Sequence, residues 1–247
     1  MQRYFIDGSL TVGHTFELDA TVSKHWRQVL RAEPGAQAEF VDGHEQLFLG
    51  ELGDGNQTTV LKALTSTVEL PVNVTILSGL PKQDKAEWIV QKATELGAHT
   101  IAFFGGDWSV ARWQDNKVAK KLVRLQKIAH GASEQSHRTH IPEIQFYSTL
   151  ATAIQAIDYD QLLVAYEEAA KQGEQAQLTR TLSQLQTGQT LVDVFGPEGG
   201  ISPAEIKTLT TNDGVLAGLG PRILRTETAP LYLLSAASTV WELQRQA

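Results

Sequence analysis

The chain contains no cysteine among its 247 residues. This absence excludes disulfides, thiolate metal sites, iron–sulfur clusters and a cysteine nucleophile. The sequence also lacks an apolar run long enough to span a membrane, and its first seven residues do not follow the basic-then-apolar order of a secretion signal. We therefore expect a cytoplasmic protein that does not enter a membrane.

Several catalytic motifs are absent as well. There is no Gly-x-Ser-x-Gly nucleophile elbow, no Walker loop with its Lys-Ser/Thr and no Gly-x-Gly-x-x-Gly fingerprint. Hydrolase, kinase and dehydrogenase interpretations therefore lack the residues that they require. His137 and His140 beside Glu134 have a spacing open to metal binding, but no cysteine supports them and Pro142 predicts a loop there, so we expect no metal.

Charge is distributed unevenly along the chain. The net charge is −7, yet residues 82–138 carry ten basic against six acidic side chains, a net charge of +4. Most of this charge lies in one segment, 116–135, where Val118, Leu122 and Leu125 recur at helical spacing and the cations fall opposite them. Such a face is either simply solvated or a surface for phosphate groups. Its basic residues are Lys117, Lys120, Lys121, Arg124 and Lys127.

The pattern of predicted secondary structure changes near residue 70. Before that point, Asp42-Gly43 predicts a hairpin turn between strands at 38–41 and 46–52, and a further strand is expected at 58–64. A short helix is expected at 23–31, with Trp26, Val29 and Leu30 on its apolar side. These short strands predict a small β-barrel. We place one domain at 1–70 and a second at 71–247.

In the second domain strands and helices alternate. Asp84 is expected to cap a helix that Gly97 ends, and a long helix is expected at 116–135. Alternating elements of this kind predict an α/β fold with a mostly parallel sheet. The strands are predicted at 72–77, 100–104, 143–147, 161–165, 190–195 and 214–220.

Two loops follow the last two of these strands. Gly196-Pro-Glu-Gly-Gly200 separates a strand from a helix that begins at Ser202, with Glu205 placed to complete a capping box. Such a loop exposes backbone N–H groups to a ligand, or is a tight turn without one. The segment 221–230 precedes an apolar helix at 231–243 and carries Arg225 and Glu227, which either serve a ligand or pair only with each other.

Six motifs follow one another along the chain: Arg27-Gln-Val-Leu-Arg31, Asp84-Lys-Ala-Glu-Trp-Ile-Val-Gln-Lys-Ala-Thr-Glu-Leu-Gly97, Ala132-Ser-Glu-Gln-Ser136 with Arg138, Ala165-Tyr-Glu-Glu168, Gly196-Pro-Glu-Gly-Gly200 and Leu219-Gly-Pro-Arg-Ile-Leu-Arg-Thr-Glu-Thr-Ala229. In this order they resemble the RsmE family of bacterial ribosomal RNA methyltransferases over nearly the whole chain. His137 is a departure, because it stands where the family has a glycine.

The resemblance implies a SPOUT-type methyltransferase domain with a C-terminal trefoil knot, preceded by a PUA-like β-barrel that binds RNA. It also implies a homodimer that methylates uridine N3 in 16S ribosomal RNA of the small subunit and uses S-adenosylmethionine. The cofactor-binding residues it implies are Tyr166, Gly196, Glu198, Gly199, Gly200, Ile201, Leu219, Gly220, Leu224, Thr226 and Thr228. The RNA-binding residues we predict are Arg3, Lys24, Arg27, Arg31, Lys117, Lys121, Arg124 and Arg138.

Methylation at N3 requires that the proton on this nitrogen be removed or the resulting anion be stabilised. Arg225 or Arg222 is predicted to stabilise the anion. Glu227 or Glu198 is predicted to accept the proton, and the choice between them stays open. Two other functions remain possible from the sequence: a non-catalytic RNA- or ribosome-binding factor, and a SPOUT enzyme that acts on transfer RNA.

Overall fold

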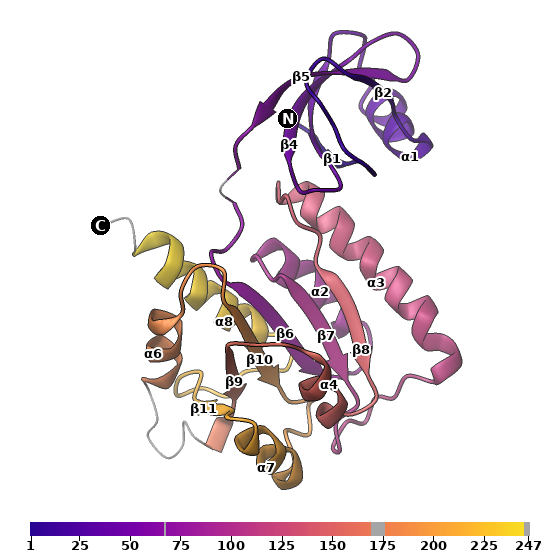
Figure 1. The fold of residues 1–247 in the computed structure, drawn as a ribbon. Helices are drawn as coiled ribbons and strands as arrows, with labels where there is room; N and C mark the ends of the chain where they lie inside the picture. Colours follow the sequence, from indigo (N-terminus) through magenta and orange to yellow (C-terminus); the bar gives the residue numbers. More distant parts are fainter. Residues whose placement is uncertain (67, 169–175, 245–247) are drawn as a thin grey trace. The chain divides into compact units, whose positions relative to one another are not determined.

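The computed structural model describes residues 1–66, 68–168 and 176–244, which form two compact units (Figure 1). The first unit comprises Met1–Glu69 and Ser133–His140, and the second comprises Leu70–Ala132 and Ile141–Ala247. The predicted domain boundary did not assign residues 133–140 to the first unit. None of the helices in the described ranges combines the length and apolarity that crossing a bilayer requires.

The first unit is built on a curled mixed sheet of five strands. Alternating burial along β3 (Gln37–Val41) and β4 (Leu47–Leu52) places Phe40 and Leu52 in a core with Tyr4 and Trp26. The expected barrel is an open sheet in the described residues, because β1 and β2 are its two edges. In spatial order the strands are β1 (Arg3–Phe5), β3 (Gln37–Val41), β4 (Leu47–Leu52), β5 (Gln57–Leu64) and β2 (Thr15–Glu17), and only β1 and β3 pair in parallel.

The predicted helix at 23–31 differs in detail from the observed one. Asp19 caps a short α1 (Ala20–Ser23), which continues as the π-helix η1 (Lys24–Val29). A π turn changes the angular spacing of side chains from the α-helical spacing on which the prediction relied. Trp26 is buried as predicted, but Val29 and Leu30 are exposed, so their assignment to the apolar side was wrong.

The second unit contains a parallel six-stranded sheet, which confirms the predicted α/β alternation. Four strands have the predicted bounds: β7 (Thr100–Phe104), β8 (Glu143–Tyr147), β9 (Gln161–Ala165) and β10 (Thr190–Phe195). The last predicted strand is shorter, because only 215–217 pair with β9. The order in the sheet is β11 (Val215–Ala217), β9 (Gln161–Ala165), β10 (Thr190–Phe195), β6 (Asn73–Gly79), β7 (Thr100–Phe104) and β8 (Glu143–Tyr147).

Helices cover both faces of this sheet (Figure 1). Leu125, Ile89 and Leu234 belong to the apolar core on one face, and Leu150 and Leu209 belong to the core on the other. The first face carries α2 (Lys85–Glu95), α3 (Asp115–Gln135), α6 (Gln177–Gln184), α8 (Ala229–Ser238) and η2 (Thr239–Leu243), and the second carries α4 (Leu150–Ala156) and α7 (Pro203–Thr211).

Of the two predicted helix N-caps, the one at α7 is confirmed and the one at α2 is not. Ser202 and Glu205 form the predicted capping box at the start of α7. Asp84 precedes α2 as predicted, but its side chain makes no capping hydrogen bond. Gly97 follows the end of α2 with φ +92°, a conformation that favours glycine.

Candidate functional site

The carboxyl ends of three neighbouring strands bring the two predicted loops together. Ala165 at the end of β9 lies opposite Phe195 of β10 on one side and Ala217 of β11 on the other. The next residues of the three strands therefore leave the sheet side by side. The sequence predicted these loops, and the register explains why they share one edge.

The same edge contains a topological switch point. Strands β6 and β10 are adjacent, but the chain leaves β6 toward β7 and leaves β10 toward β11, in opposite directions across the sheet. In open α/β sheets, ligands bind in the crevice that forms where connections diverge in this way. The residues that follow these strands, 80–84 and 196–202, are therefore placed to serve a ligand.

A cavity of about 350 Å³ opens beside this edge. Its volume lies within the range of small-molecule sites. Five residues that the sequence nominated line it: Tyr166, Leu219, Gly220, Leu224 and Arg222. Its remaining lining residues are Ala165, Glu167, Pro221, Ile223 and Ala229.

The Gly196–Gly200 loop is not among the described residues that line this cavity, and its glycines contact neighbouring parts of the chain. A Cβ on Gly199 would lie 2.7 Å from the carbonyl oxygen of Trp108, and a Cβ on Gly196 would lie 2.9 Å from Cγ1 of Ile201. Gly200 has φ +82°, which also favours glycine. Close packing inside the protein is therefore sufficient to require these glycines.

Ile201 and Thr226, two of the predicted cofactor-binding residues, are buried. Ile201 belongs to the apolar core beneath α4 and α7. The Ile201 side chain therefore packs inside the protein, and the Thr226 side chain exposes little surface to a ligand. Thr228 is exposed immediately before α8.

Lys85, which the sequence analysis did not nominate, joins the two loops. Its Nζ lies 3.0 Å from Oε1 of Glu198 and 3.0 Å from Oε2 of Glu227. Glu198 also accepts a hydrogen bond from the backbone N–H of Lys82. One ammonium group on the first residue of α2 thus holds a carboxylate from each loop.

These contacts alter the acidity of all three groups. Hydrogen bonding to Glu198, and then to Glu227, raises the pKa of Lys85. Partial burial raises the pKa of each glutamate, but hydrogen bonds from backbone N–H groups and Lys85 outweigh it, and both pKa values lie below their ordinary range. Both carboxylates are therefore ionised at neutral pH.

Arg225 lies in the open, with its side chain exposed. Its charge contributes to the lowered pKa of Glu227, but the ion pair of Glu227 is with Lys85. The alternative that Arg225 and Glu227 pair only with each other is therefore wrong. The carbonyl oxygen of Arg225 accepts hydrogen bonds from the N–H groups of Thr228 and Ala229 and so fixes the start of α8.

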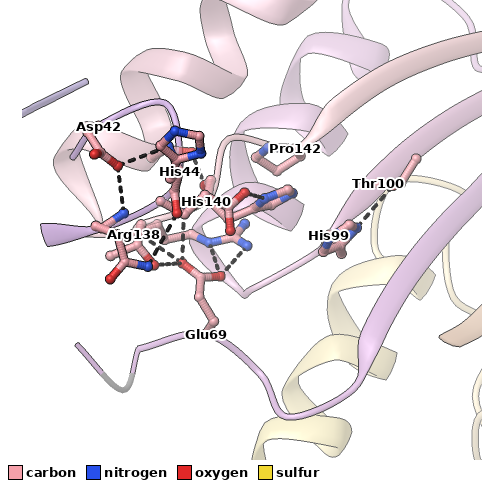
Figure 2. Close-up of polar contacts among 12 residues, drawn as sticks. Asp42, His44, Glu69, His99, Thr100, Arg138, His140 and Pro142 are labelled. Atoms are coloured by element: carbon pink, nitrogen blue, oxygen red, sulfur yellow. Dashed lines mark hydrogen bonds and ion pairs between the residues drawn. The ribbon is translucent and has the colours of Figure 1, made fainter. Parts of the chain in front are cut away.

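The predicted RNA-binding residues fall into a buried group and an exposed group. Arg138 is 3% exposed and donates hydrogen bonds to Glu69, which also accepts from the N–H groups of Thr139 and His140 (Figure 2). Arg3 is likewise buried and contacts Glu39 and the carbonyl oxygen of His137. These contacts favour structural roles for both arginines. Lys24, Arg31, Lys117, Lys121 and Arg124 are exposed, and Arg27 is partly buried with one Nη that has no hydrogen-bond partner among the described residues.

The histidines that suggested a metal point to different carboxylates. Nδ1 of His137 lies 3.1 Å from Glu39, and Nδ1 of His140 lies 2.6 Å from Glu45. Residues 1–66, 68–168 and 176–244 contain no group of three His, Asp or Glu side chains arranged to hold a metal ion.

Known proteins resemble this chain along its whole length. Residues 68–238 match the family model described as an RNA methyltransferase domain. The ribosomal RNA small subunit methyltransferase E of Bacillus subtilis is 44% identical, and the alignment covers 99% of each chain. The corresponding Mycobacterium tuberculosis protein is 28% identical over 96% of this chain and 91% of its own length.

Solved structures agree with this relationship. A ribosomal RNA small subunit methyltransferase E from Neisseria gonorrhoeae, bound to S-adenosyl methionine, is 27% identical, with a TM-score of 0.81 and 98% of each chain covered. A Legionella pneumophila methyltransferase with bound SAM is 25% identical, with a TM-score of 0.78 and 96% of each chain covered. The chain belongs to the RsmE family of small-subunit ribosomal RNA methyltransferases.

Proposed function

We propose that this protein transfers a methyl group from S-adenosylmethionine to uridine N3 of 16S ribosomal RNA in the small subunit, in the cytoplasm. The observation that carries the proposal is the 350 Å³ cavity at the carboxyl ends of β9 and β11. It lies where parallel sheets bind ligands, in a chain whose relatives in solved structures bind this cofactor.

The residues of the cavity fit such a cofactor. Leu219 and Leu224 offer apolar surface for an adenine ring, and Gly220, with φ +90°, lets the backbone approach it closely. Tyr166 and the main chain of Gly196, Glu198, Gly199 and Gly200 lie at the neighbouring strand ends. When bound, S-adenosylmethionine supplies a methyl group activated by its positively charged sulfur.

The residues beside the cavity fit the requirements of an N3 methylation. Arg225 has an exposed side chain that a substrate oxygen gaining negative charge can approach, and Arg222 lines the cavity. Glu227 and Glu198 are ionised and could each accept the N3 proton, but their lowered pKa values make them weak bases. We propose Arg225 as the anion-stabilising residue and keep both glutamates as candidate acceptors.

Three further features belong to the proposal. A trefoil knot is proposed from the family relationship; the chain passes from β10 to the outer strand β11 and then returns to α8, which packs against α2. Homodimerisation is supported by the exposed apolar side chains of Ile223, Tyr232 and Leu243 near this segment. A PUA-like role in RNA binding is supported by exposed Lys24 and Arg31 in the first unit.

The function is tested by incubating the protein with labelled S-adenosylmethionine and small ribosomal subunits from cells that lack the modification. Nucleoside mass spectrometry should then detect 3-methyluridine in the 16S RNA. Methyl transfer to transfer RNA alone would support the alternative substrate. Cofactor binding without transfer to either RNA, or no cofactor binding, would favour a non-catalytic binding factor and contradict the proposal.

A further inference from the structure

A second cavity, of about 320 Å³, lies between the start of α2 and the side of α3. Three successive turns of α3 supply four cationic side chains to its wall, from Lys117, Lys120, Lys121 and Arg124. The start of α2 supplies two carboxylates, Asp84 and Glu87. The wall is therefore net positive in a protein of net charge −7, and its other lining residues are Gln83, Ala86, Trp113 and Leu125.

The cations of this wall differ in how they are engaged. Arg124 contacts Glu87, with 2.8 Å between Nη2 and Oε1, and Nζ of Lys121 lies 5.3 Å from the centre of the Trp113 ring. Lys117 and Lys120 are exposed and form no ion pair with a described residue. Two ammonium groups in the lining of the cavity are therefore available to an anionic ligand.

The position of the cavity connects it to the site of methyl transfer. Lys85, which holds Glu198 and Glu227 of the two cofactor loops, is flanked along α2 by Asp84 and Ala86, which line the cavity. The start of α2 therefore contacts the two loops beside the proposed methyl-donor site through Lys85 and the cationic cavity through its neighbours.

We infer that this cavity binds the phosphate backbone of the RNA substrate, next to the nucleotide that is methylated. The inference rests on the proposed function and adds a location for the RNA contact. Lysine side chains are point charges that neutralise phosphates without reading base sequence. Phosphate contacts made here fix the position of the RNA, while selection of the base is left to the residues around Arg225.

The test compares two double variants that remove the same charge. Lys117→Gln with Lys120→Gln changes the lining of the cavity. Lys127→Gln with Lys207→Gln is the control, because both lysines are exposed, Lys127 lies on the same helix, and neither lines the cavity. Thermal unfolding should show the same stability for both, since all four side chains are exposed.

The cavity variant should bind deproteinised 16S RNA on the order of tenfold more weakly than the control at about 0.1 M salt, as expected for two lost phosphate contacts. Its plot of log affinity against log salt should be shallower by roughly 1.4 to 1.8. The KM for RNA should rise, with kcat at saturating RNA and cofactor affinity unchanged.

Equal RNA affinity and salt dependence in the two double variants would overturn the inference. Weaker binding to whole small subunits without weaker binding to deproteinised RNA would also overturn it, in favour of a ribosomal protein partner. If the unsubstituted protein binds RNA but methylates none, the proposed function fails, and the binding comparison still decides whether the cavity contacts RNA.

Discussion

Replacing Lys85 by methionine should both destabilise the protein and weaken its cofactor site. The side chain is 25% exposed, and its partners Glu198 and Glu227 are 24% and 19% exposed. Exposed ion pairs contribute about 0–1 kcal/mol, and breaking a buried one costs about 3–5 kcal/mol. For this degree of burial we expect a loss of about 2 kcal/mol, because Lys85→Met removes the charge and leaves two carboxylates facing each other.

That loss corresponds to a fall in Tm of roughly 4–8 °C for a chain of this size. The pKa shifts also determine how the stabilisation by this ion pair depends on pH. The lowered pKa values of Glu198 and Glu227 stabilise the fold above the ordinary glutamate pKa, and this contribution disappears as pH falls through the folded-state values. The raised pKa of Lys85 stabilises the fold below the ordinary lysine pKa, and this contribution disappears as pH rises through the folded-state value. The difference between variant and unsubstituted protein should therefore be constant between about pH 5 and pH 10 and shrink outside this range.

Calorimetry across pH and titration with S-adenosylmethionine measure the two effects. Lys92→Met is the matched control, because Lys92 lies on the same helix, is 30% exposed and pairs only three residues away with Glu95. The control should shift Tm by less than about 2 °C, as local helical pairs are weak. Lys85→Met should weaken cofactor binding several-fold, and Lys85→Arg should restore part of it. If Lys85→Met matched Lys92→Met in Tm and in cofactor affinity, Lys85 would not hold the two loops.

Three other substitutions test separate parts of the argument. Arg225→Ala should lower kcat about 10²- to 10³-fold with cofactor and RNA affinity unchanged; full turnover in rapid-mix assays would remove Arg225 from the chemistry. Asp193 is completely buried and no side chain among the described residues pairs with it, so burial raises its pKa far above the ordinary value. Asp193→Val should raise the free energy of unfolding by about 1–3 kcal/mol in urea titrations at pH 7, and a less stable variant would contradict the reasoning that an unpaired buried carboxyl destabilises the fold. Burial, with a contribution from Asp19, raises the pKa of Glu134 to about 7. Because Glu134 loses its proton at a lower pH in the unfolded chain than in the folded one, the free energy of unfolding should fall between about pH 4.5 and pH 7. Glu134→Gln should remove this pH dependence of Tm. An unchanged dependence in the variant would contradict the assignment.

The strands of the parallel sheet could be predicted from sequence because each is a short apolar run with both faces buried. The range 161–165 and the range 143–147 coincide with β9 and β8. The N-cap at Ser202 could also be predicted, because its capping box involves only Ser202 and Glu205, three residues apart. Val29 and Leu30 were placed incorrectly because their burial depends on a π turn, which the pattern of apolar residues does not specify.

Charged residues were harder to assign, because their roles depend on partners far along the chain. Arg138 looked like a phosphate ligand, but Glu69 lies 69 residues away in sequence and holds it in the interior. Lys85 stood inside a motif that carried the family resemblance, yet its partners lie 113 and 142 residues further on. Composition and spacing show that such charges exist and do not show which of them pair.

In the Gly196–Gly200 loop, close backbone packing sets the position of a charged side chain. Gly199 is required by the nearby carbonyl of Trp108, and Gly79 at the end of β6 is required by Pro197, because a Cβ there would lie 2.4 Å from Cδ of the proline ring. The loop is therefore fixed against β6 and the 105–109 segment before any ligand binds. Glu198 follows Pro197 directly, so this close packing also sets the position from which its carboxylate reaches Lys85. Replacing a loop glycine would thus move the ion pair that joins the two loops, even without direct contact with the cofactor.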